Sequence, residues 1–206
     1  MEALRSALFA TLAIVIIFTS VIVSAQTSTP SAEAPTLNPG DEWVRSNGRT
    51  FTVVGKEGDY YTMKVLWNGK ESLQWWHQKT LGLRHTQERV IFEPALELFR
   101  WPLTVGLKWC YEYAAPVTGP NVMFQRCNEV KTFEEVKVQA GSFQAFRIEA
   151  VATHLDRSAP DVYHTYWYAP QARGIVKSTS VGIAADLWQF EVVRVRLAPP
   201  KTAELK

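Results

Sequence analysis

The chain has 206 residues and a nearly neutral charge, with 22 Lys and Arg against 20 Asp and Glu. Because it contains no block of basic residues, this balance argues against a nucleic-acid partner and against electrostatic anchoring to a membrane. Eight Trp, seven Tyr and ten Phe, together with Val and Thr, favour β-strands. Helical periodicity is nearly absent outside the N-terminal apolar segment, so we expect an all-β protein.

Residues 1–25 are typical of a signal peptide. Arg5 supplies a weakly basic start, Leu8–Val23 is apolar, and a small-residue cleavage site ends at Ala25. The alternative is an uncleaved anchor, although a run of about 16 residues is short for the ~20 that span a bilayer. Export predicts a periplasmic or secreted protein, with no transmembrane segment after cleavage. The remaining chain of about 180 residues suits a single domain.

A disordered linker is expected over residues 26–38, because Ser, Thr, Pro and Ala dominate it. The β domain is expected over residues 39–198, with a polar tail at 199–206. Alternating patterns predict its first strands; they cover Trp43–Arg45, Thr50–Gly55, Tyr60–Trp67, Lys70–His77, Leu81–Thr86 and Gln87–Phe92. Between two of them, Asn68-Gly69 predicts a type I′ hairpin turn.

An extended crossover is predicted over residues 92–106, because Pro94 and Pro102 exclude a central strand. A single helical turn at Ala95–Phe99 is an option there. The chain then repeats its first half loosely, since the Gly-x-x-Trp pattern at residues 40–43 returns at residues 106–109. We expect two similar meanders of about five strands each. The alternative is that the similarity of the two halves is coincidental, because the spacing of the matching segments varies between them.

The segment Phe133–Val151 shows the period-2 alternation of a half-buried hairpin. Pairing Val138 with Phe146 places the large apolar groups on one face and predicts a loop centred on Ser142. The last predicted strand, Leu187–Leu197, changes phase after Val192, which indicates either a bulge or a strand buried on both faces. Ten or more short strands predict a strongly curved antiparallel meander sheet, closed or half-closed into a barrel.

The two cysteines flank a turn-rich tip. If the hairpin is centred between Thr118 and Gly119, Cys110 lies directly opposite Cys127. We therefore predict a cross-strand disulfide, consistent with an oxidising compartment. Two buried free thiols are the alternative. A metal-binding or catalytic cysteine is disfavoured, because there is no Cys-x-x-Cys motif and no His at ligand spacing.

His154 and His164 are weak metal-ligand candidates. A turn centred on Ala159 would place them opposite each other, with Asp156 and Asp161 nearby. Two His and two Asp could hold a divalent metal and support a metal-dependent hydrolase. The favoured alternative is a polar hairpin tip with two ordinary strand histidines.

No other residue pattern indicates catalysis. His77 and His85 have no nucleophile or carboxylate partner at a recognisable spacing, and Ser142 is not in a nucleophile elbow. The adjacent Glu134 and Glu135 point to opposite faces of a strand. The chain has no P-loop, dinucleotide fingerprint or zinc signature. We interpret it as a protein without catalytic residues or a cofactor.

The tryptophans recur near the ends of the predicted strands, and they occupy positions that face both sides of the sheet. Most of them are therefore expected to fill the core. A sharper hypothesis is an aromatic-lined concavity for an apolar ligand such as an acyl chain. The ligand-binding residues predicted on this basis are Trp75, Trp109, Trp167, Trp188 and Phe146.

Three segments resemble a group of exported bacterial proteins of unknown function: Pro102–Trp109, Glu134–Ile148 and Tyr166–Ser178. That group shares a Pro-Leu-x-x-Gly-x-x-Trp strand, an Ala-Gly-Thr-Phe-like turn, a Trp-Tyr-x-Pro strand and a Gly-x-Val-Lys strand. The likeness covers Gly40–Val195. More distantly, the group is similar to the half-barrel of Lol-type periplasmic lipoprotein carriers, which implies a curved sheet around an apolar cavity closed by helices. No lid helix is visible in this chain, and the resemblance implies no catalytic residues.

These observations favour a non-catalytic exported envelope protein. It would bind an apolar small molecule or a lipid inside the curved sheet. The alternative is a protein-interaction or scaffolding module of the cell envelope that uses a sheet edge or an aromatic patch. A metal-dependent hydrolase is the least favoured hypothesis.

Overall fold

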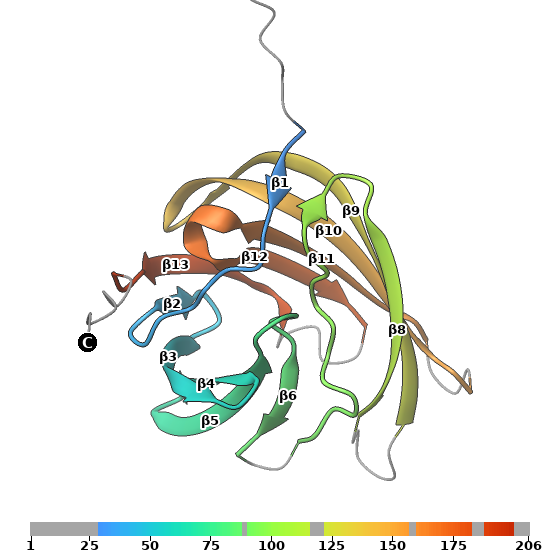
Figure 1. The fold of residues 1–206 in the computed structure, drawn as a ribbon, viewed down its shortest axis with the longest axis horizontal. Helices are drawn as coiled ribbons and strands as arrows, with labels where there is room; N and C mark the ends of the chain where they lie inside the picture. Colours follow the sequence, from blue (N-terminus) through green and yellow to red (C-terminus); the bar gives the residue numbers. More distant parts are fainter. Residues whose placement is uncertain (1–28, 88–89, 116–121, 157–159, 183–187, 200–206) are drawn as a thin grey trace, which may run out of the picture.

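The computed structural model describes residues 29–87, 90–115, 122–156, 160–182 and 188–199. The fold is all-β and is dominated by one large, curved antiparallel sheet (Figure 1). The predicted signal peptide and the tail after residue 199 lie outside the described residues. Within the described residues, no helix combines the length and the apolar character needed to cross a membrane.

The large sheet has 11 strands in the order β6-β5-β4-β3-β2-β13-β12-β11-β10-β9-β8. Their bounds are β2 (Glu42–Arg45), β3 (Thr50–Glu57), β4 (Tyr60–Trp67), β5 (Lys70–His77), β6 (Leu83–Thr86), β8 (Lys108–Ala115), β9 (Val122–Val138), β10 (Gly141–His154), β11 (Val162–Ala169), β12 (Gly174–Val181) and β13 (Phe190–Arg196). A 3₁₀ turn, η1 (Pro170–Ala172), precedes β12. A separate two-stranded sheet pairs β1 (Ser31–Ala32) with β7 (Leu103–Thr104).

The strand order consists of two meanders, β2–β6 and β8–β13, which join where β2 pairs with β13. The first meander has five strands and the second has six, against about five predicted for each, and the Gly-x-x-Trp pattern precedes or begins the first strand of both, β2 and β8. Both copies of the Gly-x-x-Trp pattern take the same conformation, because Gly40 and Gly106 have φ values of +96° and +90°. These are angles that favour glycine. Trp43 and Trp109 follow as buried strand residues, and their indole N–H groups donate to backbone carbonyls at 2.7 Å and 3.0 Å.

The predicted cysteine hairpin is confirmed in detail. Cys110 on β8 lies opposite Cys127 on β9, and the two form a disulfide. Two further features predicted from sequence are also present. Asn68 and Gly69 both have positive φ, as a type I′ turn requires. The register of β13 against β2 shifts after Val192, which matches the predicted bulge.

The register predicted for the β9–β10 hairpin is wrong. Val138 pairs with Gly141, so the turn consists of residues 139–140, and Phe146 lies opposite Phe133 rather than Val138. The two phenyl rings are 4.6 Å apart between centroids, and Phe146 is fully buried. Contact between these large rings stabilises the observed register more than the smaller valine contact would.

Two predictions of local structure also differ from the observed chain. The described part of the expected disordered linker, residues 29–38, includes β1 and the buried Leu37, whose N–H donates to the Tyr61 hydroxyl at 3.2 Å. The segment Ala95–Phe99 has no helical turn and follows an extended path across the core. Its apolar side chains explain this path, because Leu96, Leu98 and Phe99 are all buried.

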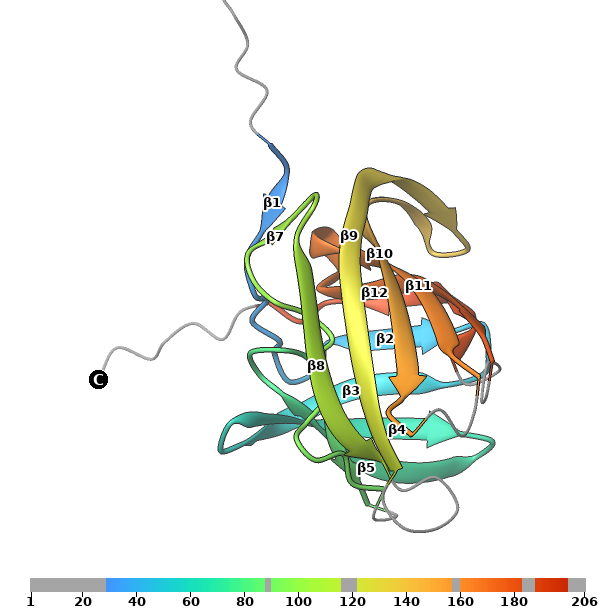
Figure 2. The ribbon, with the colours of Figure 1, turned by 90° about the vertical axis from the view of Figure 1, so that its right-hand side faces the viewer.

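The sheet curls around a single hydrophobic core, and Figures 1 and 2 show β8, β9 and β10 running along one side of it. Strands β6 and β8 stand at the two ends of the strand order. The short segment 91–93 lies between these ends, because Ile91 forms a bridge with His85 on β6 and Glu93 forms one with Ala114 on β8. The interior is therefore bounded by both meanders and by the crossover.

Candidate functional site

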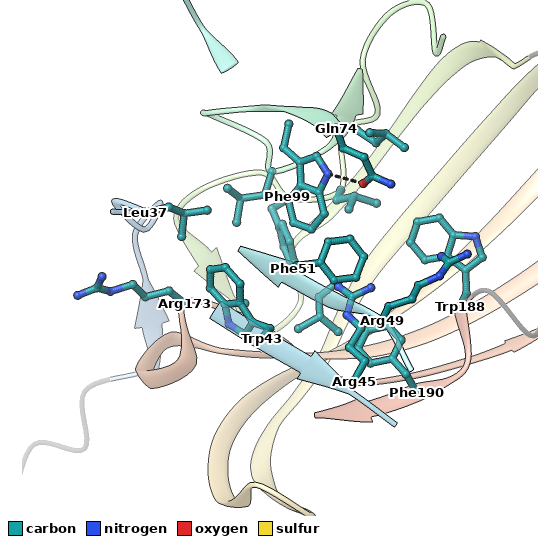
Figure 3. Close-up of a pocket in the computed structure, with 16 residues that line it drawn as sticks. Leu37, Trp43, Arg45, Arg49, Phe51, Gln74, Phe99, Arg173, Trp188 and Phe190 are labelled. Atoms are coloured by element: carbon teal, nitrogen blue, oxygen red, sulfur yellow. Dashed lines mark hydrogen bonds between the residues drawn. The ribbon is translucent and has the colours of Figure 1, made fainter. Parts of the chain in front are cut away.

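A cavity of about 100 Å³ lies inside the curved sheet (Figure 3). Strands β2, β3, β5, β6, β12 and β13 contribute to its walls, together with the crossover and with Arg173, which follows the η1 turn. Most of the lining is apolar or aromatic, and it includes Trp43, Phe51, Trp76, Leu83, Phe99 and Trp188. This composition is typical of a small-molecule site.

Contacts between strands hold the aromatic wall in place. The indole N–H of Trp43 donates to the Ala172 carbonyl in η1 at 2.7 Å, which attaches β2 to the second meander. Phe51 and Trp76 contact each other with ring centroids 5.5 Å apart. Gln74, an amide residue in the lining, accepts a hydrogen bond from the Trp76 indole at 3.0 Å, shown as the dashed line in Figure 3.

Arg45 reaches the cavity from β2 between two phenyl rings. Its guanidinium carbon lies 4.0 Å from the centroid of Phe51 and 3.9 Å from the centroid of Phe190. Its Nε atom is buried and makes no hydrogen bond to the described residues. Burial, followed by the charge of Arg49, lowers the pKa of Arg45 to about 9, so the side chain remains positive at neutral pH.

Arg49 lines the same cavity and lies over the Trp67 ring, 4.3 Å from its centroid. Burial lowers its pKa. Arg173 is the third arginine in the lining, and it pairs with the buried carboxylate of Asp41 at 3.0 Å. Among the described residues, no carboxylate lies within ion-pair distance of Arg45 or Arg49, and the lining contains no Asp or Glu. Within the described part of the chain, two of the three arginines in the lining therefore have no acidic partner.

A second polar cluster lies on the inner face of the other meander. Arg126 is 5% exposed, and its Nε donates to Asn128 Oδ1 at 3.2 Å. The Tyr166 hydroxyl lies 3.0 Å from the same oxygen. The Tyr111 hydroxyl and the ring Nδ1 of His164 are buried and make no hydrogen bond to the described residues. Asn128 Oδ1 thus accepts from Arg126 Nε, whereas the Tyr166 hydroxyl also has the Leu98 carbonyl within 3.0 Å.

We expect Asn128→Leu to lower the free energy of unfolding by about 2 kcal/mol, because it removes the amide oxygen that accepts from the buried Arg126 Nε. The Tyr166 hydroxyl keeps the Leu98 carbonyl as an acceptor at 3.0 Å. Arg126→Met should instead be nearly neutral or stabilising, since it removes a buried, unpaired charge and keeps an apolar side chain of similar length. Urea unfolding of both variants with the disulfide intact measures the two effects. A larger loss for Arg126→Met than for Asn128→Leu would contradict this interpretation of the cluster.

His164 should make stability depend on pH. Burial, followed by the charge of Arg126, lowers the pKa of His164 to about 3. An unfolded histidine titrates near pH ~6.5. Above that pH the imidazole is neutral in both states and contributes nothing. As the pH falls from 6.5 toward 3, only the unfolded state takes up the proton, so stability is lost.

His164→Phe is the matched variant, because it keeps a ring against Trp188, whose centroid lies 5.8 Å from that of His164. The free energy of unfolding of the wild type, relative to His164→Phe, should fall by about 2 kcal/mol between pH 7 and pH 5. Urea unfolding at several pH values measures the difference. Parallel pH profiles of the two proteins would contradict it.

The structure places one of the five predicted ligand-binding residues, Trp188, in the cavity wall. Trp109 and Phe146 are buried elsewhere in the core. Trp75 and Trp167 lie on the opposite face of the sheet, where their indoles donate to carboxylates of Glu57 and Glu134 at 2.8 Å. Alternation explains this division, because adjacent residues of a strand face opposite sides.

The sequence prediction missed Arg45 and Arg49. A signal for Arg45 was present, since it shares the inward parity of Trp43 on β2. An arginine on the apolar parity of a strand is unusual and indicates a buried cation. For Arg49 no such signal existed, because it lies in the turn between β2 and β3.

The predicted opposition of His154 and His164 is wrong. His154 lies opposite Phe124 on β9, and its ring contacts that phenyl ring at 4.2 Å between centroids. His164 lies opposite Ala150 on β10. The strand pairing is displaced from the predicted one, so the two histidines do not form a cross-strand pair. Among the described residues, no group of three or more His, Cys, Asp or Glu side chains could hold a metal ion.

The two interior sites differ in what they offer a ligand. The cavity combines apolar walls with two cations, whereas the Arg126 cluster satisfies much of its polarity internally. No protein-family model, no curated protein and no solved structure matches this chain. The cavity and its arginines are therefore the features from which a function can be inferred.

Proposed function

We propose that this protein is a non-catalytic, exported binding protein that holds a small apolar or amphipathic ligand in the cavity between its two meanders. The aromatic cavity inside the curved sheet is the observation that supports this function. Concave, mostly apolar sites with a few placed polar groups are typical of ligand pockets. A curved sheet around an apolar interior is also what the resemblance to Lol-type carriers implies.

The volume of the cavity limits the size of the ligand. An engineered apolar cavity of ~150 Å³ binds benzene, and this cavity has about 100 Å³. This volume limits the buried part of a ligand to a short hydrocarbon segment, with the rest of the ligand outside the cavity. A lipid with two long chains would not fit without rearrangement of the walls.

Export and a half-closed barrel are parts of the same proposal. The disulfide is compatible with a non-cytoplasmic location, and a periplasmic or secreted location follows if residues 1–25 act as a signal peptide. The bridges that Ile91 and Glu93 make to β6 and β8 support a sheet whose two ends are held together. Such closure would shield an apolar ligand from water.

Octanol titrated into the protein tests the proposal by NMR of the indole N–H groups. We expect shifts at Trp43, Trp76 and Trp188, which line the cavity. The indoles of Trp75 and Trp167 serve as internal controls, because they lie on the opposite face. No shift, or equal shifts at all five indoles, would contradict an interior site.

A variant that fills the cavity provides a second test. Leu83→Phe adds volume to the cavity wall and should weaken octanol binding at least tenfold. Leu73→Phe is the matched control, because Leu73 alternates with the lining residue Gln74 on β5 and so faces the other side. Equal affinities for octanol in both variants would place the ligand elsewhere.

A further inference from the structure

We propose that the ligand is a single-chain anionic amphiphile whose charged head is bound by Arg45 and Arg49. This inference rests on the proposed function and names the chemical class of the ligand. The class includes alkyl carboxylates and alkyl phosphates, because both present oxygens that a guanidinium can bind in a bidentate manner.

The three arginines of the lining differ in whether they have an acidic partner. Arg173 has a counter-ion, since Asp41 lies 3.0 Å away. Arg45 and Arg49 take part in no ion pair with the described residues, yet both are partly buried. A cation removed from water without a partner is costly. An anion that enters with the ligand would provide the missing partner.

Two phenyl rings lie close to the Arg45 guanidinium. Its central carbon is 4.0 Å from the centroid of Phe51 and 3.9 Å from the centroid of Phe190, which are distances typical of cation–π contacts. The Nε donor is buried and has no acceptor among the described residues. An acceptor oxygen on a ligand would pair with this donor.

Arg45 and Arg49 lie near each other in the cavity wall. The charge of Arg49 contributes to the lowered pKa of Arg45, so the two groups are close enough to repel each other. Figure 3 shows both arginines with Phe190 and Trp188 on one side of the cavity, away from Leu37 and Arg173. An apolar chain can therefore lie along the aromatic wall while its charged end meets both guanidinium groups.

Calorimetric titration of the full chain with octanoate, octyl phosphate and octanol tests this inference. We expect either anion to bind at least tenfold more tightly than octanol. Arg45→Met should reduce anion binding at least tenfold and should reduce octanol binding by a smaller factor, because octanol carries no charge to pair with the guanidinium. Arg194→Met is the control, because it removes the same charge from an exposed side chain of β13, and it should change neither affinity.

Each outcome has a defined meaning. If octanol and both anions bind with equal affinity, the inference that the ligand has an anionic head group is wrong, but the proposed function stands. If none of the three binds to a folded protein, as judged by near-ultraviolet circular dichroism, the proposed function fails as well. A preference for octanoate or for octyl phosphate identifies the head as carboxylate or phosphate. Equal loss of anion binding in Arg45→Met and Arg194→Met would mean that general charge, and not this site, attracts the anion.

Discussion

Gly82→Ala should lower the free energy of unfolding by about 3 kcal/mol or more, because the added methyl group has no room. A Cβ atom built on Gly82 would lie 1.5 Å from the carbonyl oxygen of Leu96 and 2.3 Å from its carbonyl carbon. Both are backbone atoms, so no side-chain rotation can relieve the overlap. The crossover would have to move away from the β5–β6 connection.

Gly55→Ala is the matched control, since a Cβ atom on this β3 residue would meet no atom within 4 Å. It should change the free energy of unfolding by less than about 1 kcal/mol. Urea unfolding of both variants measures the difference. Because Leu81 and Leu83 flank Gly82 and line the cavity, Gly82→Ala should also weaken octanol binding. Equal stability of the two variants would show that the crossover does not press against Gly82.

Asp41→Ala should cost about 3–5 kcal/mol, because it leaves a partly buried arginine without its partner. The Asp41 carboxylate is fully buried and accepts hydrogen bonds from three separate parts of the chain. Arg173 donates from the end of η1 at 3.0 Å, and the backbone N–H groups of Asn38 and Ala198 donate at 2.9 Å and 2.7 Å. This one side chain joins the start of the first meander to the end of the second.

A double-mutant cycle and an exposed pair provide the controls. Arg173→Gln should cost less in the Asp41→Ala protein than in the wild type, because its partner is already gone. Glu71→Gln breaks an exposed pair with Lys64 at 3.3 Å and should cost less than about 0.5 kcal/mol. Unfolding in urea gives all of these values. A loss for Asp41→Ala no larger than that for Glu71→Gln would contradict the role of Asp41.

Patterns local to one hairpin were predictable from the sequence. The disulfide followed from two cysteines placed symmetrically about one turn, and the meanders followed from alternation and from the repeated Gly-x-x-Trp pattern. The β9–β10 register was not predictable, because Phe133 competed with Val138 as the partner of Phe146. The order of residues 29–38 depends on contacts distant in sequence, such as that between Leu37 and Tyr61.

The candidate site was harder to predict, because its residues come from distant parts of the chain. Arg45 lies between Phe51 on β3 and Phe190 on β13, strands that only the pairing of the two meanders brings together. The alternation of residues along one strand shows which side chains share a face, but it does not show which face lines the cavity. Trp75 and Trp76 are adjacent, and only the second lines it.

A crystal structure of the protein with ω-bromooctanoate tests the central claim most directly. We predict an anomalous bromine peak inside the sheet, among Phe51, Trp76 and Phe99, with the carboxylate about 3 Å from the Arg45 guanidinium. Bromine density only on the outer face, near Trp75 or Trp167, would contradict a ligand cavity inside the curved sheet.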